Sequence, residues 1–361
     1  MKIALANGLL VIGVAAWAEA LRRGTVRWRR AGIHLAILGY VAASLGAVVF
    51  SQAPGVSVME LGDLATLLLV PMTVSLLTPA RWDRLLGWLA AVAAASSIAG
   101  IWQYLHGASD LGHRLRGLTT HYMTFGGWTL IVTLLLVADM AFSRDRRRLL
   151  WTAPAVVLCT TALLLSYTRN AWVGLAVGLL LMAAVWRPRA FLLYPVLALA
   201  LVVLLPRPVL DRLVSIVDLR QPSNYDRLCM LVSAEQMVQD HPLFGVGLGM
   251  VKRRYPVYRR DDAPRWSVPH LHDNLLQIAA ERGLFGLAAY VWILAAFFRH
   301  TWRALRRAGP GTFPALAGCF LAVAGISVAG LFEYNWGDAE VWILTLTCLA
   351  APYALAPEEA A

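Results

Sequence analysis

Residues 149–186 read LLWTAPAVVLCTTALLLSYTRNAWVGLAVGLLLMAAVW, which is two apolar runs separated by the short polar sequence SYTRN at 166–170. Arginine clusters flank the pair, at 144–148 before it and at 187–189 after it. A helix of about 20 apolar residues crosses a bilayer, and spans of about 17 residues are tolerated. This stretch therefore predicts two consecutive transmembrane helices whose polar ends lie at the membrane surfaces.

The whole chain has the same character. Its 361 residues are 59% hydrophobic and only 15% charged, whereas roughly a quarter of the residues of soluble domains are charged. This composition excludes a soluble enzyme, a disordered chain and a collagen-like chain. Three of the four cysteines lie inside apolar segments and one lies in a polar region, so no disulfide is expected.

Eleven apolar stretches are long enough to be candidate spans. They are 3–20, 31–51, 56–78, 85–105, 121–142, 149–167, 171–186, 190–205, 284–299, 314–332 and 340–356. The first stretch is followed by arginines without a small-residue cleavage pattern, so we interpret it as an anchored segment and not as a removed signal peptide. The fold class is therefore an all-α polytopic transmembrane bundle of about 11–12 spans.

The arginines indicate how the bundle is oriented, because loops rich in Lys and Arg stay in the cytoplasm. The alternate short loops that are rich in arginine are predicted to be cytoplasmic; they hold Arg22, Arg23, Arg27, Arg29, Arg30, Arg81, Arg84, Arg144, Arg146, Arg147, Arg148, Arg187, Arg189, Arg299, Arg303, Arg306 and Arg307. The long polar segment then faces outward. The prediction is spans 1–8 in residues 1–205, a large helical outer loop in 206–283, and spans 9–11 with a cytoplasmic tail in 284–361. The net charge is +11. Topology and contact with anionic membrane lipids explain about half of the basic residues, and no nucleic acid is expected.

The outer loop is predicted to contain a helix and a glycine turn. Between 225 and 240 the apolar residues Leu228, Leu231, Val232 and Met237 recur at helical spacing, as in an amphipathic helix, and Ser223 or Asn224 is a plausible N-cap. The sequence HPLFGVGLG at 241–249 should end that helix, because proline cannot continue it and glycine permits positive φ. We favour a turn over a phosphate-binding loop here, since no strand precedes the glycines.

A cationic stretch with interleaved aromatic residues follows the turn. Its basic residues are Lys252, Arg253, Arg254, Arg259, Arg260 and Arg265. Such a stretch is either a solvated face near lipid headgroups or a site for an anionic substrate such as a lipid phosphate or pyrophosphate.

Two polar motifs adjoin predicted spans. His270 and His272 precede an apolar segment, and we expect His272 to open a helix that leads straight into a span. A helix N-terminus favours neutral imidazole, which a general base requires. Arg169 lies between two spans; it either snorkels to the headgroups or has a function, because charge at membrane depth is costly.

These motifs together resemble the O-antigen ligase and O-antigen polymerase superfamily of bacterial membrane glycosyltransferases. The resemblance rests on the order of SYTR at 166–169, Arg227 before the HPLFGVG turn, HDNLLQ at 272–277, Glu281, and GLFG at 283–286. It extends over roughly residues 112–345 and includes RLRG at 114–117 and FEYNWGD at 332–338. Two departures stand out: Asp273 replaces the common Asn or Ser, and eleven spans are counted where the ligases have twelve with both ends inside.

The resemblance implies a GT-C-like fold in the bacterial inner membrane, with the active site at the periplasmic face. It implies inverting transfer of a glycan from undecaprenyl pyrophosphate to an acceptor hydroxyl, without a metal or other cofactor. His272 would be the base, and Arg169 and Arg227 would bind the pyrophosphate. Substrate contacts are expected from the remaining polar residues of these motifs, which are Arg116, His270, Arg253, Arg254, Arg265 and Asn274.

Several alternatives stay open at this stage. Glu333, Asp338 and Glu340 lie in one short outer loop, and with the two histidines they would suit a metal ion. The acceptor is a lipid A core in a ligase, the growing glycan in a polymerase, or a protein hydroxyl in a protein O-oligosaccharyltransferase. A transporter of an anionic lipid or solute is the alternative from another class.

Overall fold

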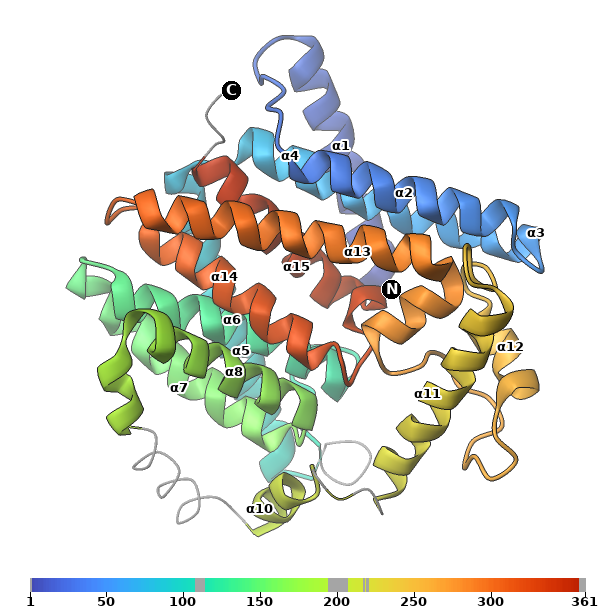
Figure 1. The fold of residues 1–361 in the computed structure, drawn as a ribbon. Coiled ribbons are helices and arrows are strands. Elements are labelled where there is room, and N and C mark those ends of the chain that lie inside the picture. The colour runs from blue at the N-terminus through green and yellow to red at the C-terminus, as the bar shows by residue number, and fades with distance from the viewer. Residues whose placement is uncertain (1, 108–113, 194–206, 217, 219–220, 357–361) are drawn as a thin grey trace. The chain divides into compact units, whose positions relative to one another are not determined.

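The structure is a computed structural model that describes residues 2–107, 114–193, 207–216, 218 and 221–356. In these residues all regular secondary structure is helical (Figure 1). The α-helices are α1 Lys2–Arg22, α2 Ile33–Val49, α3 Pro54–Ser57, α4 Leu69–Leu76, α5 Pro79–Leu105, α6 Tyr122–Phe142, α7 Leu149–Leu165, α8 Arg169–Trp186, α10 Arg207–Val214, α11 Pro222–Asp240, α12 Val251–Tyr258, α13 Asn274–Arg307, α14 Phe313–Ala329 and α15 Ala339–Leu355. Four 3-10 helices join them, η1 Met59–Leu68, η2 Arg146–Arg148, η3 Pro188–Leu193 and η4 Asn335–Gly337.

The chain is a polytopic helical membrane protein, as its composition predicts. Six helices in the described part are long and apolar enough to cross a bilayer, and α2, α14 and α15 are shorter apolar helices. The predicted span at 56–78 corresponds to Pro54–Leu76, one of these six, in which α3, η1 and α4 follow one another. Most of the predicted span at 190–205 lies outside the described residues.

The chain divides into two compact units. Unit 1 comprises Met1–Thr78, Arg220–Arg306 and Gly330–Ala361, and unit 2 comprises Pro79–Leu219 and Arg307–Ala329. In unit 2, α14 packs against α6 and α8. A Cβ on Gly174 would lie 2.5 Å from the Gly325 carbonyl oxygen, so these glycines let α8 and α14 approach as closely as small residues allow in membrane bundles.

In unit 1, α13 is broken at Gly283. This residue has φ 64° and ψ −168°, so the helix runs as two halves that meet at a kink (Figure 1). The second half begins where the span at 284–299 was predicted, and it continues to Arg307. A break leaves backbone N–H and C=O groups without their helical partners, which is costly away from water.

The glycine turn of the outer loop supplies hydrogen-bond partners for these backbone groups. Val246 donates its N–H to the Ala280 carbonyl at 2.8 Å, and Gly247 donates to the Glu281 carbonyl at 3.2 Å. In return, the Leu284 N–H donates to the Pro242 carbonyl at 2.8 Å. The turn interpretation is therefore confirmed, since these N–H groups are occupied by the protein itself.

Glycine is required on both sides of this contact. A Cβ on Gly283 would lie 2.2 Å from the backbone of Leu243, and a Cβ on Gly245 would lie 2.5 Å from the Ala280 carbonyl oxygen. Both residues also have positive φ, which side-chain-bearing residues adopt at a cost of roughly 1–2 kcal/mol.

The predicted outer-loop helix is confirmed as α11, with two corrections. Its N-cap is Gln221, not Ser223 or Asn224, because Pro222 occupies the first turn, where its fixed φ suits the helix and its missing N–H costs nothing. Its buried side chains include Met230, Ala234 and Met237, whereas Leu228 and Leu231 are exposed.

Replacement of Gly283 by Ala should destabilise the protein. The clash with Leu243 and the positive φ together should cost at least about 1–2 kcal/mol, the scale of a left-handed residue that carries a Cβ. Thermal unfolding in detergent measures this as a lowered Tm. Gly309→Ala is the matched control, since nothing lies within 4 Å of a Cβ there; equal Tm values for the two variants would contradict the expectation.

Candidate functional site

The histidine loop at 268–273 is anchored by an apolar side chain. Leu271 is 1% exposed and belongs to the core that α11 and α12 form with the loop, next to Met230, Val268 and Ala280. The histidines on either side of it, His270 and His272, are half-buried. Burial of Leu271 thus fixes the centre of the loop, and both imidazoles lie at the edge of the core.

Polar residues of α13 hold the same loop. Gln277 accepts a hydrogen bond from the Leu271 N–H at 2.8 Å and donates its amide to Glu281 at 2.9 Å. Arg282 in turn donates to Glu281 at 3.2 Å. This chain explains why the motif carries Gln and Glu four residues apart, since that spacing places them on one helix face.

His272 does not open the helix, contrary to the prediction. The helix begins at Asn274, and the Asp273 carboxylate accepts from the Leu276 N–H at 2.9 Å, which is an N-cap interaction. Asp, Asn and Ser are the strongest N-cap residues. Asp273 therefore caps the helix, as Asn or Ser would at the same position.

Asn274 fastens a second loop to this point. Its N–H donates to the Gly330 carbonyl at 2.7 Å, and its side-chain oxygen accepts from the Trp336 N–H at 3.0 Å. The side chain is 4% exposed. Asn274 thus positions residues 330–336, and a contact between it and substrate stays a prediction.

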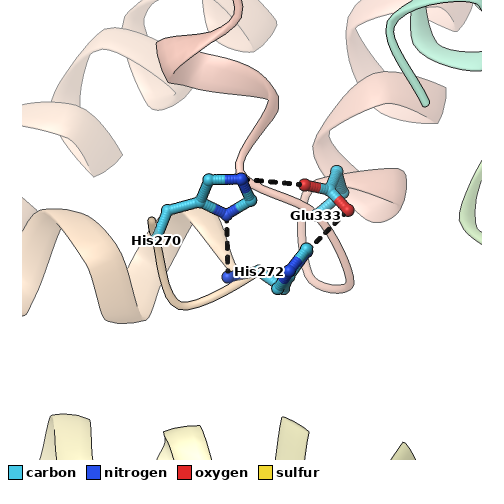
Figure 2. Close-up of side chains that lie close together, drawn as sticks. All are labelled: His270, His272 and Glu333. Carbon is cyan, nitrogen blue, oxygen red and sulfur yellow. Dashed lines mark hydrogen bonds and ion pairs between the residues drawn. The ribbon is translucent and has the colours of Figure 1, made fainter. Parts of the chain in front are cut away.

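The second loop brings Glu333 to the two histidines (Figure 2). His272 Nδ1 lies 2.8 Å from Glu333 Oε2, and His270 Nε2 lies 3.7 Å from Oε1. The two rings pack edge to face with centroids 4.3 Å apart. Two imidazoles therefore share one buried carboxylate, each facing a different oxygen.

Arg227 of α11 belongs to the same environment. Burial raises the pKa of Glu333, but its contacts with His272 and His270 and the charge of Arg227 lower it, and the pKa lies below its ordinary value. Glu333 is consequently ionised at neutral pH. Unit 1 thus brings two of the predicted site residues, His270 and His272, to one carboxylate, and the charge of a third, Arg227, acts on it.

Backbone strain coincides with the motifs. Among the described residues, Tyr167 and His272 are the non-glycine residues with positive φ, at 54° and 52°. Such conformations are costly and concentrate at functional sites. One lies directly before Thr168-Arg169 and the other in the histidine loop, which supports a role for both segments.

His270, His272 and Glu333 also have the composition of a metal site, with potential ligand atoms all within 4.8 Å of one another. A His₂Glu set suits a catalytic zinc ion. One observation favours the hydrogen-bonded arrangement over a metal site. The charge of Arg227 acts on Glu333, and a nearby positive charge disfavours a dication there.

Two further predicted residues lie in unit 2. Arg169 is buried at 7% exposure, and its Nη1 donates to the Ser215 carbonyl at 2.6 Å and to Ser215 Oγ at 3.1 Å. It therefore does not snorkel. Arg116 is half-buried beside Gly117, whose carbonyl accepts from Gln103 at 3.0 Å.

The cationic stretch is largely paired within the outer loop. Arg265 donates to Asp226 at 2.6 Å, and Arg260 donates to Asp262 at 2.8 Å. Arg254 lies over the Tyr258 ring at 5.8 Å. Lys252 and Arg253 are exposed on α12. The stretch is thus mostly a folded surface, and substrate contacts by Arg253, Arg254 and Arg265 stay predictions.

Sequence reasoning gave Glu333 no role beyond a possible metal ligand. Its partner His272 lies 61 residues away in the chain, so no local spacing could pair them. The available signal was an acidic residue between two apolar segments, because a carboxylate beside a membrane span needs a partner.

Comparison with known families agrees with the motifs. Residues 154–291 match the O-antigen ligase family, a segment that runs from α7 into the second half of α13. No curated protein matches the chain. The matched segment, which is less than half of the chain, is similar to the O-antigen ligase and O-antigen polymerase superfamily of membrane glycosyltransferases and supports that resemblance.

The cap at Asp273 gives a test of the site's framework. Asp273→Ala should lower stability by about 1 kcal/mol, whereas Asp273→Asn should keep it, because only the alanine lacks a capping oxygen. Thermal unfolding of both variants in detergent measures the difference. An alanine variant as stable as the asparagine variant would show that the cap contributes nothing.

Proposed function

We propose that the protein transfers a glycan from an undecaprenyl-pyrophosphate donor to an acceptor hydroxyl, at the periplasmic face of the bacterial inner membrane. The observation that carries this proposal is the contact of His270 and His272 with Glu333, a carboxylate on which the charge of Arg227 also acts. The match to the O-antigen ligase family supports the lipid-linked donor.

In the proposed reaction, His272 is the general base. It takes the proton from the acceptor hydroxyl, whose oxygen forms the new bond to the anomeric carbon of the donor. The bond between that carbon and the pyrophosphate breaks, and its electron pair leaves with undecaprenyl pyrophosphate. Attack from the face opposite the leaving group inverts the anomeric configuration. The proton on His272 is then released to solvent.

The pyrophosphate requires cations, because negative charge develops on it as the bond breaks. Arginine suits this task, since its planar guanidinium binds phosphate oxygens with two parallel hydrogen bonds. We assign this role to Arg227 and Arg169, with Arg116 as a further contact. The proposal uses no metal ion or other cofactor.

The acceptor in the proposal is a sugar of the lipid A core, as in an O-antigen ligase. A growing glycan would make the protein a polymerase, and a protein hydroxyl would make it an O-oligosaccharyltransferase. All three share the donor and the base, so the assay must offer each acceptor separately.

His272→Ala should abolish transfer, because no other group would accept the hydroxyl proton. Arg227→Ala or Arg169→Ala should each cost about 2–4 kcal/mol of transition-state stabilisation, the scale of losing one charge-stabilising donor. The measurement is transfer from purified undecaprenyl-pyrophosphate glycan to core lipid in detergent. The control is Arg207→Ala, because Arg207 is exposed and lies outside the motifs. This variant should transfer glycan at nearly the native rate. Full activity in any motif variant would remove that residue from the mechanism.

Removal of divalent cations tests the alternative use of the His₂Glu group. With EDTA present, transfer by the native chain should continue at an unchanged rate, because the proposed chemistry needs only protein side chains. Loss of transfer that zinc restores would instead make His270, His272 and Glu333 metal ligands. No chemistry with any glycan donor and acceptor would favour a transporter.

A further inference from the structure

The two histidines are not equivalent, although both face Glu333. A neutral imidazole has one nitrogen that donates and one that accepts, and the partners of each nitrogen indicate which is protonated. The contacts of His270 and His272 can therefore be assigned one ring at a time (Figure 2).

Both nitrogens of His270 are engaged. Its Nδ1 accepts a hydrogen bond from the backbone N–H of His272 at 3.3 Å. The proton of the neutral ring is then on Nε2, which faces Glu333 Oε1 at 3.7 Å. His270 therefore has no nitrogen lone pair left to accept a proton from substrate.

His272 has the opposite arrangement. Its Nδ1 lies 2.8 Å from Glu333 Oε2, and an ionised carboxylate only accepts hydrogen bonds. The proton of the neutral ring is thus on Nδ1, and the lone pair is on Nε2. No described residue forms a hydrogen bond with Nε2 of His272, so that nitrogen is available.

Hydrogen bonds within the loop that carries Glu333 fix the position of its carboxylate. Glu333 is 5% exposed, its Oε1 accepts from the Tyr334 N–H at 3.3 Å, and its carbonyl accepts from the Asn335 N–H at 2.9 Å. Asn274 binds the next residue of the loop, Trp336, at 3.0 Å. The carboxylate therefore has one fixed direction relative to the histidine loop.

From these contacts we infer that Glu333 is a positioning residue for the transfer reaction, which holds His272 in the tautomer that exposes Nε2 and stabilises the imidazolium formed when Nε2 takes the acceptor proton. This inference rests on the proposed function, since it requires His272 to be the base. His270 helps to position both residues, because its Nε2 faces the second carboxylate oxygen and its Nδ1 accepts a hydrogen bond from the His272 N–H.

The alternative is that Glu333 is merely structural, a partner that neutralises Arg227 and the two histidines. Both views predict some loss of activity when Glu333 is changed. They differ in the pH profile, because only a carboxylate that acts through the base alters the pH at which the base becomes protonated.

The test compares Glu333→Gln with the native chain, in transfer assays that give kcat and donor KM across the pH range. The expected result is a fall in kcat of about 10- to 100-fold, the scale seen when an orienting partner is removed, with little change in donor KM. The acid limb of the kcat profile should move to lower pH, because the imidazolium has lost the carboxylate that stabilises it.

The matched control is Glu235→Gln, which makes the same chemical change at an exposed position of α11. It should leave kcat and the pH profile as in the native chain. Glu333→Asp is the second variant and keeps the charge while withdrawing it from His272 by one methylene. Its kcat should fall several-fold even if Glu333→Gln does not fold.

An acid limb unchanged in Glu333→Gln would overturn the inference, as would native kcat in Glu333→Asp. Failure of the proposed function has a different signature. If His272→Ala retains transfer, His272 is not the base, whatever the Glu333 variants do. If the native chain transfers no glycan, the donor assignment fails before any variant is compared.

Discussion

The break in α13 at Gly283 is the constraint on which the architecture of unit 1 depends. A helix broken at buried residues must find new partners for its backbone groups, since burial keeps water from them. The outer-loop turn supplies those partners through Val246, Gly247 and Pro242. The turn is therefore part of the helix's hydrogen bonding, and α11 and α12, which flank the turn in sequence, are tied to a membrane helix in this way.

The first half of α13 connects the break to the site through hydrogen bonds of its side chains. Glu281 orients Gln277, and Gln277 holds Leu271 between the two histidines. At the start of the helix, Asn274 binds the loop that carries Glu333. One short helical segment thus fixes both partners of the His272–Glu333 hydrogen bond, although they lie 61 residues apart in sequence.

The sequence predicts the local features of this arrangement and misses the long-range ones. Apolar runs and arginine clusters indicate the helices, because span length and loop charge are local properties. Helical spacing located α11 but not its buried face, since Leu228 is exposed while Met230 is buried. Pairings such as Glu333 with His272 arise from tertiary packing, which no spacing rule contains.

The charge of the outer loop shows why composition alone does not define a binding site. Its arginines are numerous, yet Arg265 and Arg260 are paired with aspartates within the loop. Such pairs lower the field that the loop presents to an anionic lipid, because each cation is offset by a near carboxylate. Arg227 differs from them, since its charge acts on Glu333 at the histidines. In the proposed reaction, recognition of the pyrophosphate would therefore depend on where single arginines are held and not on how many there are.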